Sequence, residues 1–540
     1  MHRLRQNPMS EHTPYRVLVS DPLARSGLEL LRQAGLAVDV RTGLSPAELI
    51  ETIGGYDALV VRSGTRVTAD VIAAADRLKV IARAGVGLDN IDVPAATRRG
   101  IIVANAPTGN VVSAAEHTIA LLMALARNLP AAHLSMVRGE WDRRRFMGVE
   151  VRDKVLGTLG LGRVASHVVR RALGLNMRVV AHDPFVSQEY AGNLGVTLVG
   201  LEEVLAQSDF LTIHLPLNEQ TRGLLDARRL ALCKPGARII NTARGPIIDE
   251  EALLQALDAG HVAGAALDVF AQEPLPPDSP LRSHPRIILT PHIGGSTSEA
   301  QDQVAVDAAT QVIDVLQDRP ARYAVNAPLI PSTDIEFLTP FVQLVETMGR
   351  FMTQFQPTPV NQVELVVHGP LAEYDTLILQ AAALRGLLAD VVEERVNIVN
   401  ADIIAQRRGI IISERRQRHH SERYENMVTL RVHANGKTTS VRGSVLHGEP
   451  CIVAIEDLWV EFVARGNYLL SWHTDRPGVI GAIGTLLGQN DINIAFMHVG
   501  RRAPRGEAIM VLRTDEPVPE SLLPEINRVI ASHQARVISL

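Results

Sequence analysis

The stretch Lys154-Val-Leu-Gly-Thr-Leu-Gly160-Leu-Gly162-Arg-Val-Ala165 is the most informative part of the chain. Its apolar run predicts a strand, and the glycines predict a tight turn that opens into a helix. Gly160 permits the turn, Gly162 lets backbone amides approach a pyrophosphate, and Ala165 is small enough for close packing of the helix. A Gly-x-Gly-x-x-Ala string alone is a weak signal, so the flanking sequence decides its meaning.

The next expected strand, Arg178-Val-Val-Ala-His182, ends at Asp183. This is about 20 residues after the glycine turn, where a carboxylate accepts a hydrogen bond from a ribose 2′-hydroxyl and repels a 2′-phosphate. The segment therefore predicts binding of NAD rather than NADP. The alternative is an aspartate that caps a loop at the end of a strand.

The same strand and helix rhythm extends to both sides of this segment. Runs such as Arg16-Val-Leu-Val and Ala58-Leu-Val-Val alternate with Ala- and Leu-rich stretches of helical period. This alternation is typical of α/β folding around parallel sheets. The glycine segment then belongs to a Rossmann domain, expected at residues 111–299.

A second α/β lobe, of flavodoxin-like type, is expected at 15–110. A helical stretch at 112–127, followed by loops, connects the two lobes, and a second helix is expected at 298–317. Tyr323-Ala-Val-Asn, beyond the second helix, can return the chain to the first lobe. That lobe is therefore expected to be discontinuous, with residues 300–327 as its second part.

Composition bounds the class of protein. With 540 residues the chain is long enough for several cores, and its 46% hydrophobic and 21% charged residues are typical of globular domains. A net charge of −5 disfavours a nucleic-acid binder, and no apolar run approaches the length of a membrane span. Two cysteines exclude a disulfide framework and a cysteine metal cluster. We therefore expect no metal site. Because Met1 to Tyr15 has no signal-peptide character, we also expect a soluble cytoplasmic protein.

Three further segments carry candidate chemistry, each just after an expected strand and so at the carboxyl edge of the sheet. They are Asn241-Thr-Ala-Arg244-Gly-Pro, Ala266-Leu-Asp268-Val-Phe-Ala-Gln-Glu273-Pro and Leu289-Thr-Pro-His292-Ile-Gly-Gly. Oxidation of a secondary alcohol by hydride loss needs a base for the hydroxyl proton, and an imidazole suits this task. His292 is the candidate base, Glu273 its carboxylate partner, and Arg244 the group that holds a substrate carboxylate. Singly, each also fits a plain role as a loop histidine, a capping glutamate or a surface arginine.

The order of these motifs over residues 15–325 resembles the D-isomer-specific 2-hydroxyacid dehydrogenase family. The resemblance implies that Arg244, Glu273 and His292 form the catalytic set. It also implies a set of cofactor-lining residues beside Gly160, Gly162 and Asp183, namely Arg163, Val164, Thr242, Ala243 and Asp268. Val86, Leu215 and Pro246 depart from the commonest family pattern, which leaves the finer hydrogen bonds to the cofactor open.

Within that family, the first lobe resembles the phosphoglycerate dehydrogenases. The segments Val61-Arg62-Ser63 and Ala82-Arg83-Ala-Gly85 match residues that contact the phosphate and carboxylate of 3-phosphoglycerate. Two arginines supply the forked donors that a phosphate needs. The segment Gly139-Glu-Trp141-Asp-Arg143 matches one that reaches a neighbouring subunit's active site, which implies at least a homodimer and favours a tetramer. The alternative for Arg62, Arg83 and Arg143 is a solvated loop charge.

The last segment, residues 467–540, has a βαββαβ pattern that resembles an ACT domain, a module that senses amino acids. Leu469-Leu-Ser-Trp-His473-Thr-Asp475 runs from a strand toward a helix, and Ile492-Asn493-Ile is the next strand. In the long phosphoglycerate dehydrogenases, residues matching His473, Asp475 and Asn493 hold L-serine at a domain interface. These three residues also fit as ordinary polar groups of loops and strand ends.

Residues 334–466 resemble the α+β intervening domain of those long enzymes, after a linker at Pro328-Leu-Ile-Pro331. A strand is expected at Asn361-Gln-Val-Glu-Leu-Val-Val and a helix at 375–388. The charge run that includes Arg407-Arg408 and Arg415-Arg416 is expected to be a solvated loop rather than an anion site.

The resemblance implies NAD-dependent oxidation of 3-phospho-D-glycerate to 3-phosphohydroxypyruvate, the first step of serine synthesis, with serine as a feedback inhibitor. Two alternatives stay open. One is a dehydrogenase for glyoxylate or hydroxypyruvate, which needs neither Arg62 with Arg83 nor the ACT module. The other is a non-catalytic NAD sensor or corepressor, since fold alone does not establish activity.

Overall fold

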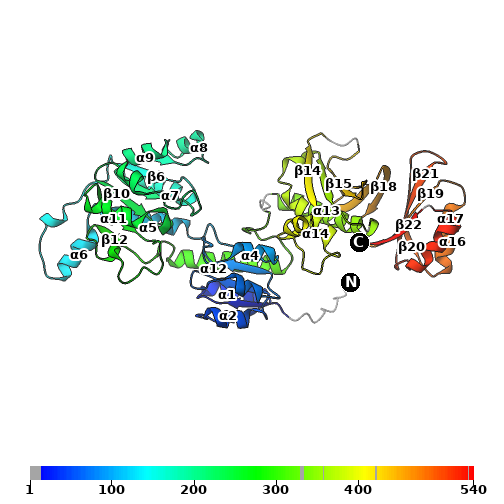
Figure 1. The fold of residues 1–540 in the computed structure, drawn as a ribbon, viewed down its shortest axis with the longest axis horizontal. Helices are drawn as coiled ribbons and strands as arrows, with labels where there is room; N and C mark the ends of the chain where they lie inside the picture. Colours follow the sequence, from blue (N-terminus) through cyan, green and yellow to red (C-terminus); the bar gives the residue numbers. More distant parts are fainter. Residues whose placement is uncertain (1–13, 329–333, 357, 420–422, 533) are drawn as a thin grey trace, which may run out of the picture.

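The computed structural model describes residues 14–328, 334–356, 358–419, 423–532 and 534–540. The opening segment and most of the expected linker lie outside the described residues. Figure 1 shows two α/β lobes followed by two α+β units, with the last unit, in red, at one end of the molecule. The expected fold class, two Rossmann-like lobes followed by an α+β unit and an ACT unit, is confirmed.

The first lobe is a parallel sheet in the order β2-β1-β3-β4-β5, which is the flavodoxin-like order that we expected. Residues alternate across β1, so Val17 and Val19 join the core on one face of the sheet while Leu18 joins the core on the other. Its elements are β1 (Arg16–Val19), α1 (Arg25–Gln33), β2 (Ala37–Val40), α2 (Pro46–Ile53), β3 (Ala58–Val61), α3 (Ala69–Ala73), β4 (Val80–Arg83), α4 (Val93–Arg98) and β5 (Ile102–Ala104).

Helix α12 (Ser298–Leu316) follows the second lobe in sequence but packs on the first. Val304, Ala308 and Val312 share a core cluster with Val17 and Val19, and Figure 1 shows this helix in green against the blue lobe. Beyond it, the amide of Val325 donates to the carbonyl of Val103 at 2.7 Å. Residues after 300 therefore complete the core of the first lobe.

The second lobe is a parallel sheet in the order β12-β11-β10-β9-β6-β7-β8. The strands are β6 (Val155–Leu159), β7 (Arg178–His182), β8 (Thr197–Leu198), β9 (Phe210–Ile213), β10 (Ala237–Asn241), β11 (Val262–Leu267) and β12 (Ile287–Leu289). The helices are α5 (Val111–Ala126), α6 (Leu129–Val137), η1 (Arg144–Phe146), α7 (Arg163–Gly174), α8 (Gln188–Asn193), α9 (Leu201–Gln207), α10 (Ala227–Ala231), η2 (Gly245–Ile247), α11 (Glu250–Asp258) and η3 (Pro280–Arg282).

Helix α6 stands where the sequence predicted loops, because Pro130 can begin a helix and an apolar stretch follows it. In the described part of the chain, no single helix is long and apolar enough to cross a membrane. Taken together, α5 and α6 pass that test of length and composition, but they are bent by 64° from one another. Helix α5 packs in the core of the second lobe through residues such as Leu121 and Leu122.

The third unit has a mixed sheet in the order β14-β13-β15-β16-β17-β18, in which only β13 and β14 run parallel. Its elements are α13 (Ile335–Phe355), β13 (Gln362–His368), η4 (Pro370–Glu373), α14 (Leu377–Leu388), α15 (Ala401–Arg407), β14 (Ile411–Gln417), β15 (Met427–Ala434), β16 (Lys437–Leu446), β17 (Glu449–Ile455) and β18 (Leu458–Val463). The expectation of a solvated loop at Arg415 and Arg416 is wrong, because both lie on β14. The edge of a sheet tolerates such charges, and Arg415 pairs with Glu364 on β13 at 3.1 Å.

The last unit is an antiparallel sheet in the order β20-β21-β19-β22, the topology of a βαββαβ fold. Its elements are β19 (Asn467–Thr474), α16 (Val479–Gln489), β20 (Ile494–Arg501), β21 (Glu507–Thr514), η5 (Glu520–Leu522), α17 (Leu523–Ile530) and β22 (Gln534–Ser539). Tyr468, Leu470 and Ile538 join the core of the third unit, so one face of this sheet packs against that unit.

The buried side chain of Gln311 on α12 joins the two halves of the first lobe. Its Nε2 donates to the carbonyl of Asn105, and its Oε1 accepts from the amide of Tyr323 at 2.9 Å. Gln311→Leu leaves both backbone groups without a partner, so we expect the free energy of unfolding of this lobe to fall by roughly 2 kcal/mol or more. Urea unfolding measures the loss. Gln303→Leu, on the exposed face of the same helix, is the matched control, and an equal effect of both variants contradicts this role of Gln311.

Candidate active site

The glycine turn between β6 and α7 leaves room for a ligand. Gly160 has a φ of +90°, and a Cβ there would lie 2.5 Å from the carbonyl oxygen of His214. Only glycine fits this position without strain. A Cβ at Gly162 would meet no atom within 4 Å, so the space in front of the first turn of α7 is open. Amides at the start of a helix bind phosphate, which fits the pyrophosphate of a dinucleotide.

An open cavity of about 650 Å³ lies between the two lobes in front of this turn. Residues 86–89 of the first lobe line one side of it. The second lobe contributes most of the predicted cofactor residues, namely Gly162, Arg163, Val164, Thr242 and Ala243, together with Arg244. The cavity therefore joins the expected cofactor residues to one member of the expected catalytic set.

Asp183 lies at the end of β7 beside the turn. Its Oδ2 accepts from the amide of Leu161 at 2.8 Å, and its Oδ1 accepts from the amide of Phe185 at 2.9 Å. The carboxylate thus stabilises the glycine turn through these hydrogen bonds. This is the capping role that we gave as the alternative to ribose binding. The carboxylate also keeps lone pairs for a ribose hydroxyl, because a carboxylate has about four acceptor sites.

Glu273 and His292 form a close pair. The Nδ1 of His292 lies 2.6 Å from the Oε2 of Glu273, whose Oε1 accepts from the amide of Phe270 at 3.0 Å. Burial acts to raise the pKa of Glu273, but the hydrogen bond and charge of His292 outweigh it and hold that pKa below its usual range. Glu273 therefore stays ionised and can stabilise a protonated imidazole. His292 has a φ of 54°, a left-handed conformation that non-glycine residues adopt at a cost of about 1 kcal/mol.

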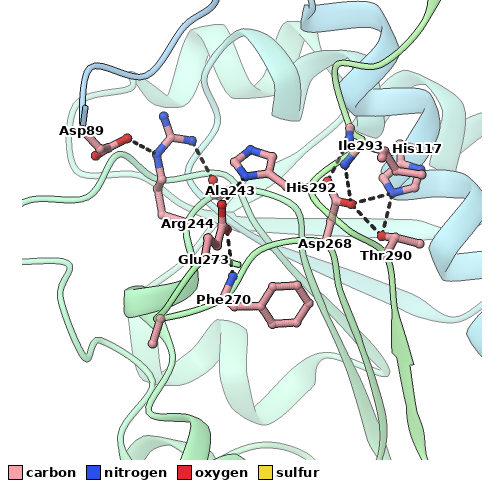
Figure 2. Close-up of polar contacts among 12 residues, drawn as sticks. Asp89, His117, Ala243, Arg244, Asp268, Phe270, Glu273, Thr290, His292 and Ile293 are labelled. Atoms are coloured by element: carbon pink, nitrogen blue, oxygen red, sulfur yellow. Dashed lines mark hydrogen bonds and ion pairs between the residues drawn. The ribbon is translucent and has the colours of Figure 1, made fainter. Parts of the chain in front are cut away.

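Arg244 lies beside this pair, and Figure 2 shows the three side chains grouped at the ends of their loops. Its Nε donates to Asp89 of the first lobe at 3.2 Å, and its Nη1 donates to the carbonyl of Ala243 at 2.7 Å. Gly87 makes room for the guanidinium, because a Cβ there would lie 2.2 Å from Nη2. Arg244 thus spans the cavity from one lobe to the other.

Arg62 and Arg83 belong to the same positively charged region. Burial, and then repulsion from Arg244, lowers the pKa of Arg83 to about 10, and Arg62 adds to this effect. Asn90 holds the two segments together, since its Nδ2 donates to the carbonyl of Arg62 at 2.6 Å and its Oδ1 accepts from Nε of Arg83 at 3.1 Å. Gly85 leaves space for the Arg83 guanidinium, 2.5 Å from where a Cβ would stand. Crowded cations of this kind favour a multiply charged anion.

Ser63 faces the catalytic pair across the gap between the lobes. It lines a second open cavity of about 650 Å³ together with Glu273 and His292. The carboxylate of Asp21, at the end of β1, shapes the loop before it by accepting the amides of Arg62 and Thr65 at 2.6 and 3.1 Å. Of the predicted substrate residues, the structure thus places Ser63 in one cavity with the candidate base His292.

Asp268, predicted to line the cofactor, is not among the described residues that line the interlobe cavity. It is 1% exposed, and its carboxylate accepts from Thr290 Oγ1, from the amides of Ile293 and Gly294, and from His117 Nε2, at 2.6 to 3.2 Å. Burial acts to raise the pKa of Asp268, but these donors hold it below its usual range. In this structure the side chain anchors the loop that carries His292.

Arg143 stands apart from the site within one chain. It is exposed, in a segment where Trp141 is 76% exposed. The candidate serine residues do not form a single group within one chain. His473 is buried near the end of β19, and Asp475 follows it and accepts from Arg501 at 2.7 Å.

Asn493 precedes β20 and donates to Asp515 at 2.6 Å. His473 pairs with Ala508 on β21, whereas Ile494 pairs with Thr514, six positions along the same strand. This separates Asn493 from the other two residues by about 20 Å.

Several residues that shape the site were not predicted from the sequence: Asp21, Asp89, Asn90, His117 and Thr118. Asp21 had a usable signal, since it follows a predicted strand at the carboxyl edge of a sheet. Asn90 and His117 had none, because only the folded chain brings them to their partners. No group of three or more His, Cys, Asp or Glu residues able to hold a metal occurs among the described residues.

Comparisons with known proteins agree with this geometry. Family models match the D-isomer specific 2-hydroxyacid dehydrogenase NAD binding domain at residues 119–294, the D-3-phosphoglycerate dehydrogenase intervening domain at 337–456 and the ACT domain at 468–531.

Among full-length relatives, a D-3-phosphoglycerate dehydrogenase from Synechocystis is 46% identical over 98% of this chain and 95% of the relative. One from Archaeoglobus fulgidus is 43% identical over 97% of this chain and its own full length. Among solved structures, a glyoxylate reductase from Paecilomyes thermophila is 30% identical with a TM-score of 0.54, covering 58% of this chain and 99% of that one. The chain therefore belongs to the D-3-phosphoglycerate dehydrogenases, a branch of the D-isomer-specific 2-hydroxyacid dehydrogenase family.

Proposed function

We propose that the protein oxidises 3-phospho-D-glycerate to 3-phosphohydroxypyruvate with NAD, and that L-serine inhibits it. One observation carries the assignment of the reaction. The Glu273–His292 pair at 2.6 Å lies at the interlobe cleft beside Arg244, and the charges of Arg244 and Arg62 act on the half-buried Arg83. A base and a cluster of cations at one place suit a phosphorylated hydroxy acid.

His292 takes the proton of the C2 hydroxyl, and Glu273 stabilises the resulting imidazolium. Gly162, Arg163 and Thr242, which line the cavity in front of the glycine turn, would hold NAD, and the bound cofactor would supply the hydride acceptor for oxidation of C2 to a ketone. Arg244 binds the substrate carboxylate and polarises the oxygen at C2. The proton then passes from His292 to solvent, which returns the base to its starting form.

Arg62 and Arg83 are the proposed phosphate site. Burial and then repulsion from Arg244 lower the pKa of Arg83, and a phosphate relieves the repulsion, so binding gains from both hydrogen bonds and charge. The phosphate pair favours 3-phosphoglycerate over glyoxylate or hydroxypyruvate, which carry no phosphate. The hydrogen-bonded pair of His292 and Glu273 disfavours a non-catalytic sensor, because such a protein needs no general base.

We infer that the working form is a homo-oligomer, at least a dimer. Helix α6 and the segment after it expose a set of large apolar side chains, namely Leu129, Leu134, Met136, Val137, Trp141 and Met147. An exposed apolar patch of this kind fits a contact with a second copy of the chain. Arg143 lies within this segment, so a dimer contact is the route by which it can reach a partner's active site.

Serine binding also needs two copies of the ACT unit. Asp475 suits the ammonium and Asn493 suits the carboxylate or hydroxyl of serine, yet they stand at opposite ends of one sheet. One serine reaches both only when two sheets lie side by side in opposite directions. A contact between two ACT units, together with the separate contact at α6, joins four copies of the chain into a tetramer.

His292→Ala should lower kcat by about 100-fold or more, because the hydroxyl proton then has no base. NADH binding, followed by its fluorescence, should stay within a few-fold of wild type, since the glycine turn is untouched. His447→Asn, an exposed turn residue, is the control. A kcat for His292→Ala near that of the control rules out His292 as the base.

Arg62→Ala should mainly raise KM for 3-phosphoglycerate, by about 10-fold or more, through loss of a charged hydrogen bond to phosphate. The reaction with an unphosphorylated substrate such as D-glycerate should change little. Arg98→Ala, exposed on the same lobe, is the matched control. Equal losses with phosphorylated and unphosphorylated substrates refute the phosphate assignment.

Asn493→Ala should relieve serine inhibition without lowering the basal rate, because Asn493 is remote from the catalytic cleft. Initial rates of NADH formation across a millimolar serine series give the inhibition constant. Gln489→Ala, exposed at the end of α16, should remain as sensitive as wild type. A wild-type enzyme that serine does not inhibit contradicts the regulatory proposal and leaves the catalytic one intact.

A further inference from the structure

Helix α5, which begins where the chain crosses between the lobes, is largely apolar and carries a stripe of polar side chains on one face. The stripe follows the helical spacing of one face and consists of Ser113, His117 and Thr118, with Asn110 at the N-cap before them. Ser113 Oγ lies 2.6 Å from Thr297 Oγ1, and Thr118 Oγ1 lies 2.8 Å from Thr242 Oγ1. One face of one helix therefore contacts the two loops that carry His292 and Arg244.

His117 makes the central contact of this stripe. Its Nε2 lies 3.1 Å from Thr290 Oγ1 and 3.2 Å from Asp268 Oδ1, as Figure 2 shows. Thr290 Oγ1 already donates its own hydrogen to Asp268 at 2.6 Å, and an ionised carboxylate has no hydrogen to give. Nε2 therefore carries the hydrogen, which Thr290 and Asp268 share.

This arrangement fixes the backbone on both sides of the base. Thr290 is tied to Asp268 and His117 before His292, and Ile293 and Gly294 are tied to Asp268 after it. A Cβ at Gly294 would lie 3.1 Å from Asp268 Oδ2 and 3.9 Å from His117 Cδ2, so the loop passes close to the histidine ring. The left-handed backbone of His292, with φ 54°, is held between these anchors.

We propose that His117 is a positioning residue for the base His292, a role that rests on the proposed function. Among the described residues it lines neither of the two cavities at the site, so it acts through Asp268 and Thr290 rather than on the substrate. Loss of its hydrogen leaves a buried carboxylate with one donor fewer and lets the 290–294 loop move. A shift of the base by about 1 Å can cost about 100-fold in rate.

His117→Leu, which keeps the bulk of the ring but not its donor, tests the role. We expect kcat to fall about 10- to 100-fold, while KM for 3-phosphoglycerate and the dissociation constant of NADH stay within about 3-fold, because neither ligand touches His117. With 3-phosphoglycerate deuterated at C2, the isotope effect on kcat should rise above that of wild type, since the chemical step becomes slower than product release.

Three variants complete the design. His117→Gln, whose amide nitrogen can occupy the place of Nε2, should recover most of kcat. His117→Asn is too short to reach Asp268 and should resemble His117→Leu, and it serves in place of that variant if the leucine prevents folding. Glu116→Gln, on the exposed side of the same helix where Glu116 pairs with Arg171 at 2.7 Å, should match wild type.

Each ratio of variant to wild type is also measured for hydroxypyruvate reduction with NADH. A wild-type enzyme inactive on 3-phosphoglycerate but active on hydroxypyruvate overturns the proposed substrate, and the ratios still test His117. The positioning role is wrong if folded His117→Leu or His117→Asn keeps wild-type kcat. It is also wrong if His117→Gln loses as much as they do, or if the isotope effect does not rise.

Discussion

The short hydrogen bond between Glu273 and His292 is the contact on which the proposed chemistry depends. The carboxylate alone is a poor base for an alcohol, and the imidazole alone lacks the negative charge that stabilises its protonated form. The two residues come from different loops at the carboxyl edge of one parallel sheet, so the sheet must set both loops in register. Asp268 contributes to this by anchoring the His292 loop from beneath.

The rest of the fold supplies the charges that this pair needs around it. Arg244 reaches across the cleft to Asp89, while Arg62 and Arg83 approach from the first lobe. Three guanidinium groups so close together repel one another, which is unfavourable for the free protein and favourable for binding a phosphorylated acid. The chain crosses between the lobes at α5 and again at α12, and Ser113 of α5 contacts Thr297, where the His292 loop ends and α12 begins.

Much of the fold could be predicted from local sequence patterns. The glycine turn, the strand ending at Asp183 and the alternation of strands and helices follow from short-range chemistry, and the topology of both parallel sheets agrees with them. Helix α6 and strand β14 were missed because their sequences fit a loop as well as an element. For Arg415 and Arg416, the deciding factor was pairing with a distant strand, which the local sequence does not contain.

The candidate site, too, could be predicted from the sequence only in part. The motifs placed Arg244, Glu273 and His292 on neighbouring loops, because strand ends share one edge of a sheet. They did not reveal that Asp268 faces the His292 loop, or that His117 supports it, because these contacts depend on the angle at which α5 crosses the sheet. The distance between Asn493 and Asp475 likewise follows from the strand order β20-β21-β19, which no single motif encodes.

A crystal structure of the protein with NADH and 3-phosphoglycerate bound tests the central claim most directly. The account predicts that the free imidazole nitrogen of His292 lies within hydrogen-bond distance of the C2 oxygen, with the nicotinamide on the other side of that carbon. It also predicts the phosphate on Arg62 and Arg83 and the carboxylate on Arg244. A ring of His292 turned away from the substrate, or a phosphate bound elsewhere, would contradict it.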